Sequence, residues 1–201
     1  RHNNAVGPAI LEFKNSKSNF TLTNNYFSLP TKLFNFKSDG YSIIKINQKQ
    51  IFIDYKEPKF QNNIFEIIDV PFVFIDLNFD DNKEILLTKY GQGQRHGNSY
   101  EAYSLSDGEL EPELYQITNE TPYNEIDFMT EINKKSKELT IYSSGGVCYN
   151  SYSTYSSINK NLILTKIVRT ERENKTNKCY KFTYSVKNGK EKLILKEVNE
   201  Q

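Results

Sequence analysis

A short acidic stretch from Asp76 to Glu84 has the side chains and the spacing of a calcium-binding loop. Counted from Asp76, side-chain oxygens recur at the first, third, fifth and ninth positions, and the seventh position can offer a backbone carbonyl. Calcium accepts about six to eight hard oxygen ligands, and a tight loop can supply several of them at this spacing. The sequence therefore predicts a Ca²⁺ site whose ligands are Asp76, Asn78, Asp80, Asn82 and Glu84.

The segments on either side of this loop, VPFVFI and ILLTKY, are apolar and β-prone, so we expect strands to hold it. An EF-hand needs Gly at the sixth position and Glu at the twelfth, where this chain has Asp81 and Leu87. The loop is similar to the shorter, strand-flanked type of FG-GAP repeats. Because Asp and Asn are also common turn residues, a metal-free acidic turn is the alternative.

A second candidate site follows a predicted strand, at the sequence SSGGVCY. The paired glycines Gly145 and Gly146 let the backbone approach another molecule closely and expose N–H donors. Ser144 adds a hydroxyl, and Tyr149 adds a large amphipathic surface that is ordered at low entropic cost. We call residues Ser144–Tyr149 the hook and interpret it as a binding loop; an ordinary glycine-rich hairpin turn is the alternative.

The two cysteines, Cys148 in the hook and Cys179, are either buried free thiols or one disulfide. A bond between them would close a loop of about 30 residues and stabilise the fold by roughly 3–4 kcal/mol in the chain-entropy model. Such a bond persists only in an oxidising compartment. We favour the disulfide and a periplasmic location, in which case the bond would also stiffen the hook.

Catalytic chemistry is poorly supported by the sequence. Apart from His2 near the N-terminus, the histidine is His96, which lies in a polar, glycine-rich loop with no local nucleophile or orienting carboxylate. Neither G-x-S-x-G nor H-E-x-x-H is present. We therefore expect a protein that is not an enzyme; a hydrolase that uses Asp and Glu side chains near the acidic loop is the weakest alternative.

The overall charge argues against a nucleic-acid partner. Lys+Arg 26 against Asp+Glu 25 leaves a net charge of +1, which is not the charge of a nucleic-acid binder. No apolar run approaches the roughly 18 residues of a transmembrane segment. The basic stretch from Lys166 to Lys192 is interrupted by Glu171, Glu173 and Glu191, so we interpret it as a solvated hairpin face and not as a polyanion site.

The pattern of short apolar segments and turns predicts an all-β fold with little helix. We expect two packed, mainly antiparallel sheets, either a β-sandwich or a partial, propeller-like arrangement. One domain should cover residues 1–201, with 1–9 a frayed or foreign terminus. Hairpin turns are expected at 47–49, 106–108 and 187–189, and PFVFI is expected to be a central strand because it is apolar on both faces.

In the order of three of its sequence features, this chain resembles bacterial periplasmic lysozyme-inhibitor and immunity proteins. The acidic D-x-N-x-D-x-x-x-E loop comes first, a hairpin from Asn98 to Tyr103 follows, and S-G-x-x-x-Y stands at Ser144–Tyr149. The resemblance is best over residues 69–198. A further basic motif of such inhibitors is echoed, with shifted spacing, by Arg169-Thr170-Glu171-Arg172.

The resemblance implies a non-enzymatic periplasmic inhibitor or immunity protein. Such a protein inserts a loop into the cleft of a secreted, lysozyme-like enzyme that degrades peptidoglycan. Here the inserted residues would be Ser144, Gly145, Gly146 and Tyr149, with Arg169 beside them. Calcium would be structural, and a signal peptide or lipoprotein leader would have been removed. The alternative is a calcium-stabilised surface or adhesion module that binds a glycan or a protein receptor.

Overall fold

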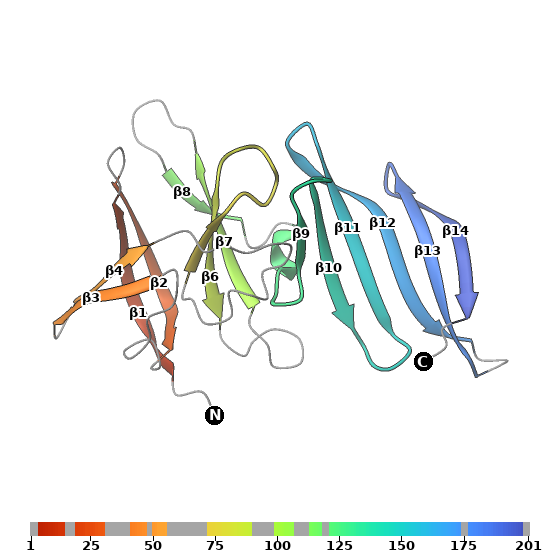
Figure 1. Cartoon of the computed structure of the whole chain (residues 1–201), viewed down its shortest axis with the longest axis horizontal. Helices are drawn as coiled ribbons and strands as arrows, with labels where there is room; N and C mark the ends of the chain where they lie inside the picture. The colour runs from red at the N-terminus through yellow and green to blue at the C-terminus, as the bar shows by residue number, and fades with distance from the viewer. Residues whose placement is uncertain are drawn as a thin grey trace.

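The computed structural model of this chain describes both candidate sites and most of the strands around them (Figure 1). The described ranges are 4–14, 19–30, 41–47, 50–55, 72–89, 99–106, 113–117, 121–173 and 177–198. His96 and the glycine-rich loop around it lie outside these ranges. Every residue of the predicted calcium site and of the hook lies inside them.

The described chain is almost entirely β-structure, as the sequence predicts, and its ladders are antiparallel. The strands are β1 (Asn4–Lys14), β2 (Asn19–Pro30), β3 (Tyr41–Asn47), β4 (Gln50–Tyr55), β5 (Phe72–Ile75), β6 (Glu84–Lys89), β7 (Ser99–Ser106), β8 (Glu113–Gln116), β9 (Glu131–Asn133), β10 (Glu138–Ser144), β11 (Asn150–Ile158), β12 (Asn161–Arg172), β13 (Cys179–Lys187) and β14 (Lys190–Val198). A short 3₁₀ turn, η4 (Tyr123–Glu125), precedes β9.

Two sheets contain most of the strands (Figure 1). One has the order β5-β6-β7-β8, and the other has the order β14-β13-β12-β11-β10-β9, so neighbours along the chain are neighbours in space. The pairs β1–β2 and β3–β4 form separate hairpins. This arrangement agrees with an all-β, sandwich-like fold. Within the described ranges, no helix is long and apolar enough to cross a membrane.

The hydrophobic core joins the four-stranded sheet to only part of the six-stranded sheet. Val73, Ile85 and Leu86 contribute from the first sheet, and Leu139 and Tyr155 contribute from β10 and β11 of the second. Beyond β12 the second sheet has little cover, and every described residue of β14 is exposed. The C-terminal strands therefore extend past the core, and both of their faces meet solvent.

The predicted hairpins are partly confirmed. Asn47 pairs with Gln50, and Lys187 pairs with Lys190 across a two-residue turn. In that second turn Asn188 and Gly189 both have positive φ, as the preferred two-residue hairpin turn requires. The turn predicted at 106–108 falls mostly on residues outside the described ranges; the strands that flank it pair as a hairpin, with Ser106 opposite Glu113.

The segment PFVFI forms an edge strand and not the expected central strand. In the described sheet β5 has only β6 as a neighbour, yet Phe72, Val73 and Ile75 are buried. The ring of Phe13 on β1 packs edge-to-face on Phe72 and Phe74, at centroid distances of 5.2 and 5.5 Å. Burial of both faces therefore comes from a hairpin lying over the strand. Residues 4–9, expected to be frayed, are the first half of β1 in that same hairpin.

A polar network attaches the β1–β2 hairpin to the four-stranded sheet. The amide of Asn24 donates to Glu101 Oε2 at 2.6 Å, and the hydroxyl of Tyr103 donates to the same oxygen at 3.1 Å. Lys89 Nζ lies 2.6 Å from the other oxygen, Oε1. Asn24 and Tyr103 are both buried, so these bonds satisfy polar groups that water does not reach.

Candidate functional site

The acidic loop joins β5 to β6 and alternates between polar and apolar side chains. Leu77 is fully buried and Phe79 is 8% exposed, and both belong to the hydrophobic core. Asp76, Asn78 and Asp80, which separate them, remain partly accessible. The alternation turns the oxygens to the outside of the loop while the apolar side chains anchor it.

Within the loop, the acidic side chains hydrogen-bond the backbone. The two carboxylate oxygens of Asp76 accept from the N–H groups of Asp80 and Asp81, both at 3.0 Å. The carboxylate of Asp80 accepts from the Asn82 N–H at 2.8 Å. Ser157 on β11 donates its hydroxyl to the Asn78 carbonyl at 2.6 Å, which ties the loop to the six-stranded sheet. These bonds are of the kind that Asx turns use.

Glu84 is the most unusual member of the predicted ligand set. Its side chain is 1% exposed and accepts a hydrogen bond from the Leu77 N–H at 2.8 Å. The pKa of its carboxyl is raised from 4.5 to about 7. Burial is the largest cause, and the nearby charges of Asp80 and Asp76 contribute to the same shift. A carboxylate buried beside two others is destabilised in its charged form, and a divalent cation would relieve that repulsion.

The donor set of this loop therefore fits a hard cation in its chemistry. All the candidate ligands supply oxygen, and three of them are carboxylates close enough to interact. Within the described ranges, however, no group of three or more His, Cys, Asp or Glu side chains is placed so that it could hold a metal ion. Calcium would have to draw the carboxylates away from the backbone N–H groups that they now accept.

The hook connects β10 to β11 and presents its apolar side chains to solvent. Val147 is 75% exposed and Tyr149 is 56% exposed. The connection from β10 to β11 lies at the lower end of the six-stranded sheet in Figure 1. The Gly145 N–H donates to the Tyr149 carbonyl, and the Tyr149 N–H donates to the Gly146 carbonyl at 3.1 Å. Gly146 has φ +127°, a conformation that residues with a side chain rarely adopt.

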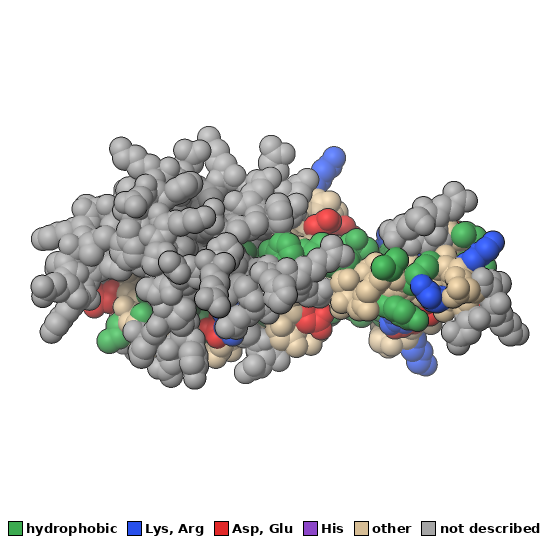
Figure 2. Space-filling view, turned by 90° about the horizontal axis from the view of Figure 1, so that it is seen from below, with side chains coloured by type: hydrophobic (Ala, Val, Ile, Leu, Met, Phe, Trp, Pro, Cys, Tyr) green, Lys and Arg blue, Asp and Glu red, His purple; other side chains and the backbone are tan. Residues whose placement is uncertain are grey.

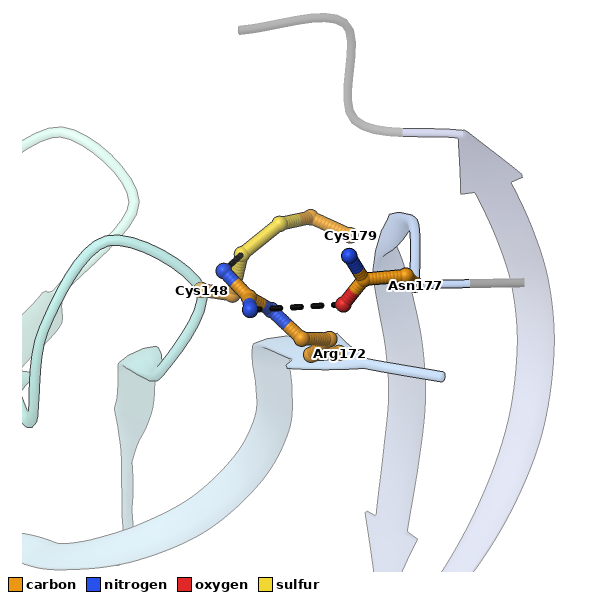
Figure 3. Close-up of a disulfide and its surroundings, with 4 residues drawn as sticks. All are labelled: Cys148, Arg172, Asn177 and Cys179. Carbon is orange, nitrogen blue, oxygen red and sulfur yellow. Dashed lines mark hydrogen bonds between the residues drawn. A yellow bond between two sulfur atoms is a disulfide. The ribbon is translucent and has the colours of Figure 1, made fainter. Parts of the chain in front are cut away.

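The predicted disulfide between Cys148 and Cys179 is present (Figure 3). Cys148 is 2% exposed, and the bond joins the hook to the first residue of β13, across the end of β12. The guanidinium of Arg172 lies beside it, with Nη2 3.9 Å from Cys148 Sγ and Nη1 donating to Asn177 Oδ1 at 3.3 Å. The middle of the hook is thus fixed while its neighbours on either side are exposed. The bond is compatible with an oxidising, extracytoplasmic compartment.

Ser144 supports the base of the hook. Its hydroxyl donates to Asn150 Oδ1 at 2.8 Å, and the Tyr142 hydroxyl donates to the same oxygen at 3.0 Å. The ring of Tyr142 also packs against Tyr152, with centroids 4.9 Å apart. Ser144 therefore holds the two strands in register where the loop begins.

Arg169 is not brought together with the hook. Arg169 pairs with Ser151 on β11, whereas Ser144 pairs with the preceding residue, Asn150. Because successive residues of a strand point to opposite faces, Arg169 and Ser144 lie on opposite faces of the sheet. Its guanidinium makes a two-bond contact with Glu191, at 2.8 and 2.6 Å, and lies 5.3 Å from the Tyr184 ring centroid. The hydrogen bond from Arg169 to Glu191 raises the pKa of the guanidinium further.

Sequence reasoning missed three residues that shape the hook. Val147 supplies the most exposed apolar side chain, Asn150 accepts both hydroxyl bonds at the base, and Arg172 lies against the disulfide. Val147 could have been found, because an apolar residue between two glycines and a disulfide cysteine has no core position to occupy. The partners of Asn150 and Arg172 depend on strand register, which no local pattern reveals.

Comparisons with known proteins identify a fold but no family. No family model matches the chain, and no curated protein matches it significantly. One similar solved structure is that of a Xanthomonas type IV secretion system related protein, with a TM-score of 0.57 and 14% sequence identity. The alignment covers 92% of this chain and 78% of the other. The similarity is therefore one of fold, and it extends over nearly the whole chain.

Proposed function

We propose that this protein is an extracytoplasmic inhibitor or immunity protein that acts without catalysing a reaction. Its hook would enter the substrate cleft of a secreted, lysozyme-like enzyme that cleaves peptidoglycan. The observation that carries the proposal is a loop clamped at Cys148 and solvent-exposed at Val147 and Tyr149. A fold shared with a protein described as related to type IV secretion supports a secretion-associated role.

The chemistry of the hook suits such a target. Glycosidases place two carboxyl groups across the scissile bond, in a cleft that the substrate normally fills. Among the described residues, the structure records no acceptor for the N–H groups of Gly146 and Val147. These donors would bond a carboxylate of the cleft, while the side chains of Val147 and Tyr149 exclude water. Charge-assisted bonds in a desolvated cleft are strong.

A clamped loop also lowers the cost of binding. Each side chain or backbone segment that is ordered only on association reduces the affinity. Here the disulfide, the glycine turn and the Ser144–Asn150 bond fix the loop before a partner arrives. Only the few rotatable bonds of the exposed Val147 and Tyr149 side chains then remain to be ordered on binding.

Calcium would have a structural role, some distance from the hook along the chain. The ligands would be Asp76, Asn78, Asp80, Glu84 and the carbonyl of Asn82. Because Ser157 bonds the Asn78 carbonyl, a cation in the acidic loop would stiffen the junction between the two sheets. The buried, mutually repelling carboxylate of Glu84 supports this part of the proposal.

A glycan-binding module is the second candidate, and one feature favours it. Tyr180, Phe182 and Tyr184 form a ladder on β13, with successive centroids 6.3 and 6.4 Å apart. Exposed aromatic ladders can stack on sugar rings. Here, however, Lys196 Nζ lies 4.2 Å from the Tyr180 centroid and Arg169 lies over Tyr184, so cations of the chain already occupy ring faces. The hook is therefore the better-supported site.

The test compares substitutions of two exposed aliphatic residues, one in the hook that precedes β11 and one at the far end of β11. Val147→Glu changes the hook, and Ile158→Glu changes a residue that is 48% exposed at the other end of the strand. Substitutions of Gly145 or Gly146 are less informative. A Cβ at Gly145 would lie 3.3 Å from Tyr149 atoms, and Gly146 has positive φ, so either change alters the loop itself.

The assay follows the clearing of a peptidoglycan suspension by lysozymes of each structural type and by secreted bacterial muramidases. We expect stoichiometric inhibition of at least one enzyme by the unmodified protein and by Ile158→Glu. Val147→Glu should weaken inhibition by about 10-fold or more, which corresponds to roughly 1.4 kcal/mol. Equal inhibition by the two variants would reject the hook. Binding to peptidoglycan itself, without inhibition of any enzyme, would favour the glycan module.

A further inference from the structure

In the C-terminal strands, charged residues that are mixed in the sequence lie on different faces of the sheet, because side chains alternate along each strand. Paired residues in adjacent strands point to the same face, and successive residues alternate. The register places Lys166 with Ser185, Thr170 with Lys181 and Lys187 with Lys190 on one face of the sheet. The cations on this face, which we call the cationic face, are Lys166, Arg172, Lys181, Lys187, Lys190 and Lys192.

Over these three strands the cationic face carries six cations and one carboxylate, that of Glu197. The opposite face is balanced. It carries Arg169 and Lys196 together with Glu171 and Glu191. Arg169 pairs with Glu191, and Lys196 Nζ lies 3.2 Å from Glu173. The carboxylates that interrupt the basic stretch in sequence therefore neutralise the other side of the sheet.

The cations of the cationic face are exposed and outnumber the carboxylates on it. All six side chains are exposed, and none of them takes part in an ion pair with a described residue. From Lys181 to Lys187 the face extends about 20 Å along β13, at roughly 3.3 Å per residue. Figure 2 shows basic and hydrophobic side chains gathered at this end of the molecule. Like charges held this close attract a multivalent anion.

The positive charge is confined to the C-terminal strands. Farther along the same face, towards β9, Glu131 and Glu138 line a pocket together with Lys166. The field therefore weakens towards the core of the protein. On β14 the exposed side chain of Leu195 lies among the lysines, at 47% exposure.

We propose that the cationic face docks on the phosphate headgroups of an anionic lipid bilayer. The side chains are mainly lysines, which bind phosphate as flexible point charges. Protein interfaces are instead depleted of lysine and enriched in arginine and aromatic residues at their centres. The docking surface is the open face of a sheet and matches a planar, multivalent partner. Each lysine near such a surface adds a similar small increment, so several are needed together.

This inference does not depend on the hook or its target. The contact would be peripheral, with the sheet face lying on the lipid headgroups. Attraction of this kind weakens as salt screens the charges. It also falls if the lysines are neutralised, even when the fold is unchanged.

The test is co-sedimentation with large vesicles of phosphatidylglycerol and phosphatidylcholine, against vesicles of phosphatidylcholine alone. The first variant is Lys187→Gln/Lys190→Gln/Lys192→Gln on the cationic face. The matched control is Lys135→Gln/Lys137→Gln/Lys160→Gln, which removes the same charge from exposed turn residues. Melting temperatures of both variants establish that each is folded.

We expect the protein to bind the phosphatidylglycerol vesicles at low salt and to leave phosphatidylcholine in solution. The cationic-face variant should bind about 100-fold more weakly, and the control should lose less than about 10-fold. No binding to anionic vesicles, equal binding to neutral vesicles, or equal losses in the two variants would each overturn the proposal. Binding to polyglutamate but not to vesicles would overturn it in favour of an acidic protein partner.

Discussion

The acidic loop and the hook are both short connections between antiparallel strands, yet they are built in opposite ways. The acidic loop buries its apolar side chains, Leu77 and Phe79, and turns its polar groups onto its own backbone. The hook exposes its apolar side chains, Val147 and Tyr149, and buries only the sulfur that anchors it. The first design contributes to stability, and the second leaves surface for a partner.

The sharpest test of this difference truncates one aliphatic residue in each loop. Leu77→Ala should destabilise the protein by about 2–5 kcal/mol, because it leaves a cavity in a fully buried position. Val147→Ala should change stability by no more than about 0.5 kcal/mol, because its side chain is already in water. Urea unfolding measures both. Similar losses in the two variants would mean that the hook is a packed loop and not an exposed one.

The disulfide should contribute more to the stability of the hook than any of its other contacts. The bond closes a loop with a sequence separation of 31 residues. Replacing both cysteines by serine, as Cys148→Ser/Cys179→Ser, should cost about 3–4 kcal/mol in the chain-entropy model. Guanidinium unfolding under non-reducing conditions gives the value. A loss below about 1 kcal/mol would show that the hook is held by its hydrogen bonds alone.

Glu84 predicts how the calcium-free acidic loop responds to pH. The unfolded carboxyl titrates near 4.5, and burial raises the pKa of the folded carboxyl to about 7. Between these values the folded state holds a proton that the unfolded state has released, so stability falls as pH rises. The group's contribution is fully present below pH 4.5 and is lost above pH 7, a change of about 3 kcal/mol.

The variant Glu84→Gln tests this pH dependence. In chelator the variant should lack this fall in stability and should exceed the unmodified protein at alkaline pH. Its amide oxygen can still accept the bond from the Leu77 N–H. Chemical unfolding at several pH values provides the comparison. Parallel curves for the two proteins would mean that the Glu84 carboxyl is not destabilised by its surroundings.

Calcium should produce the smallest of these effects, and only through the acidic loop. With an affinity in the range of about 10⁻⁴–10⁻³ M, about 10 mM calcium would stabilise the folded state by roughly 1.4–2.7 kcal/mol. That corresponds to a rise in melting temperature of about 3–10 °C for a chain of this size. Asp80→Asn should reduce the rise, and Val147→Ala should not. No rise in chelator-stripped protein at millimolar calcium would leave only the metal-free turn.

Local patterns in the sequence were sufficient to locate most strands and the positions of both loops. Alternating β-branched and aromatic residues predicted the strands, and Asn188-Gly189 predicted the tightest turn, because positive φ is required at both positions. The spacing of oxygens marked the acidic loop, and two glycines beside a cysteine marked the hook. The pairing of Cys148 with Cys179 followed once a disulfide was favoured, because the chain has only these two cysteines.

What only the tertiary structure decided is which side chains share a face. The sequence from Lys166 to Lys192 has mixed charge, and the family resemblance implied that Arg169 lies beside the hook. Strand register placed Arg169 on one face, against Glu191, and gathered the unpaired lysines on the other. The same register left β14 beyond the core. The physical reason is that side chains in a strand alternate with period two, so a shift of one residue would exchange the faces, and only long-range packing selects the register.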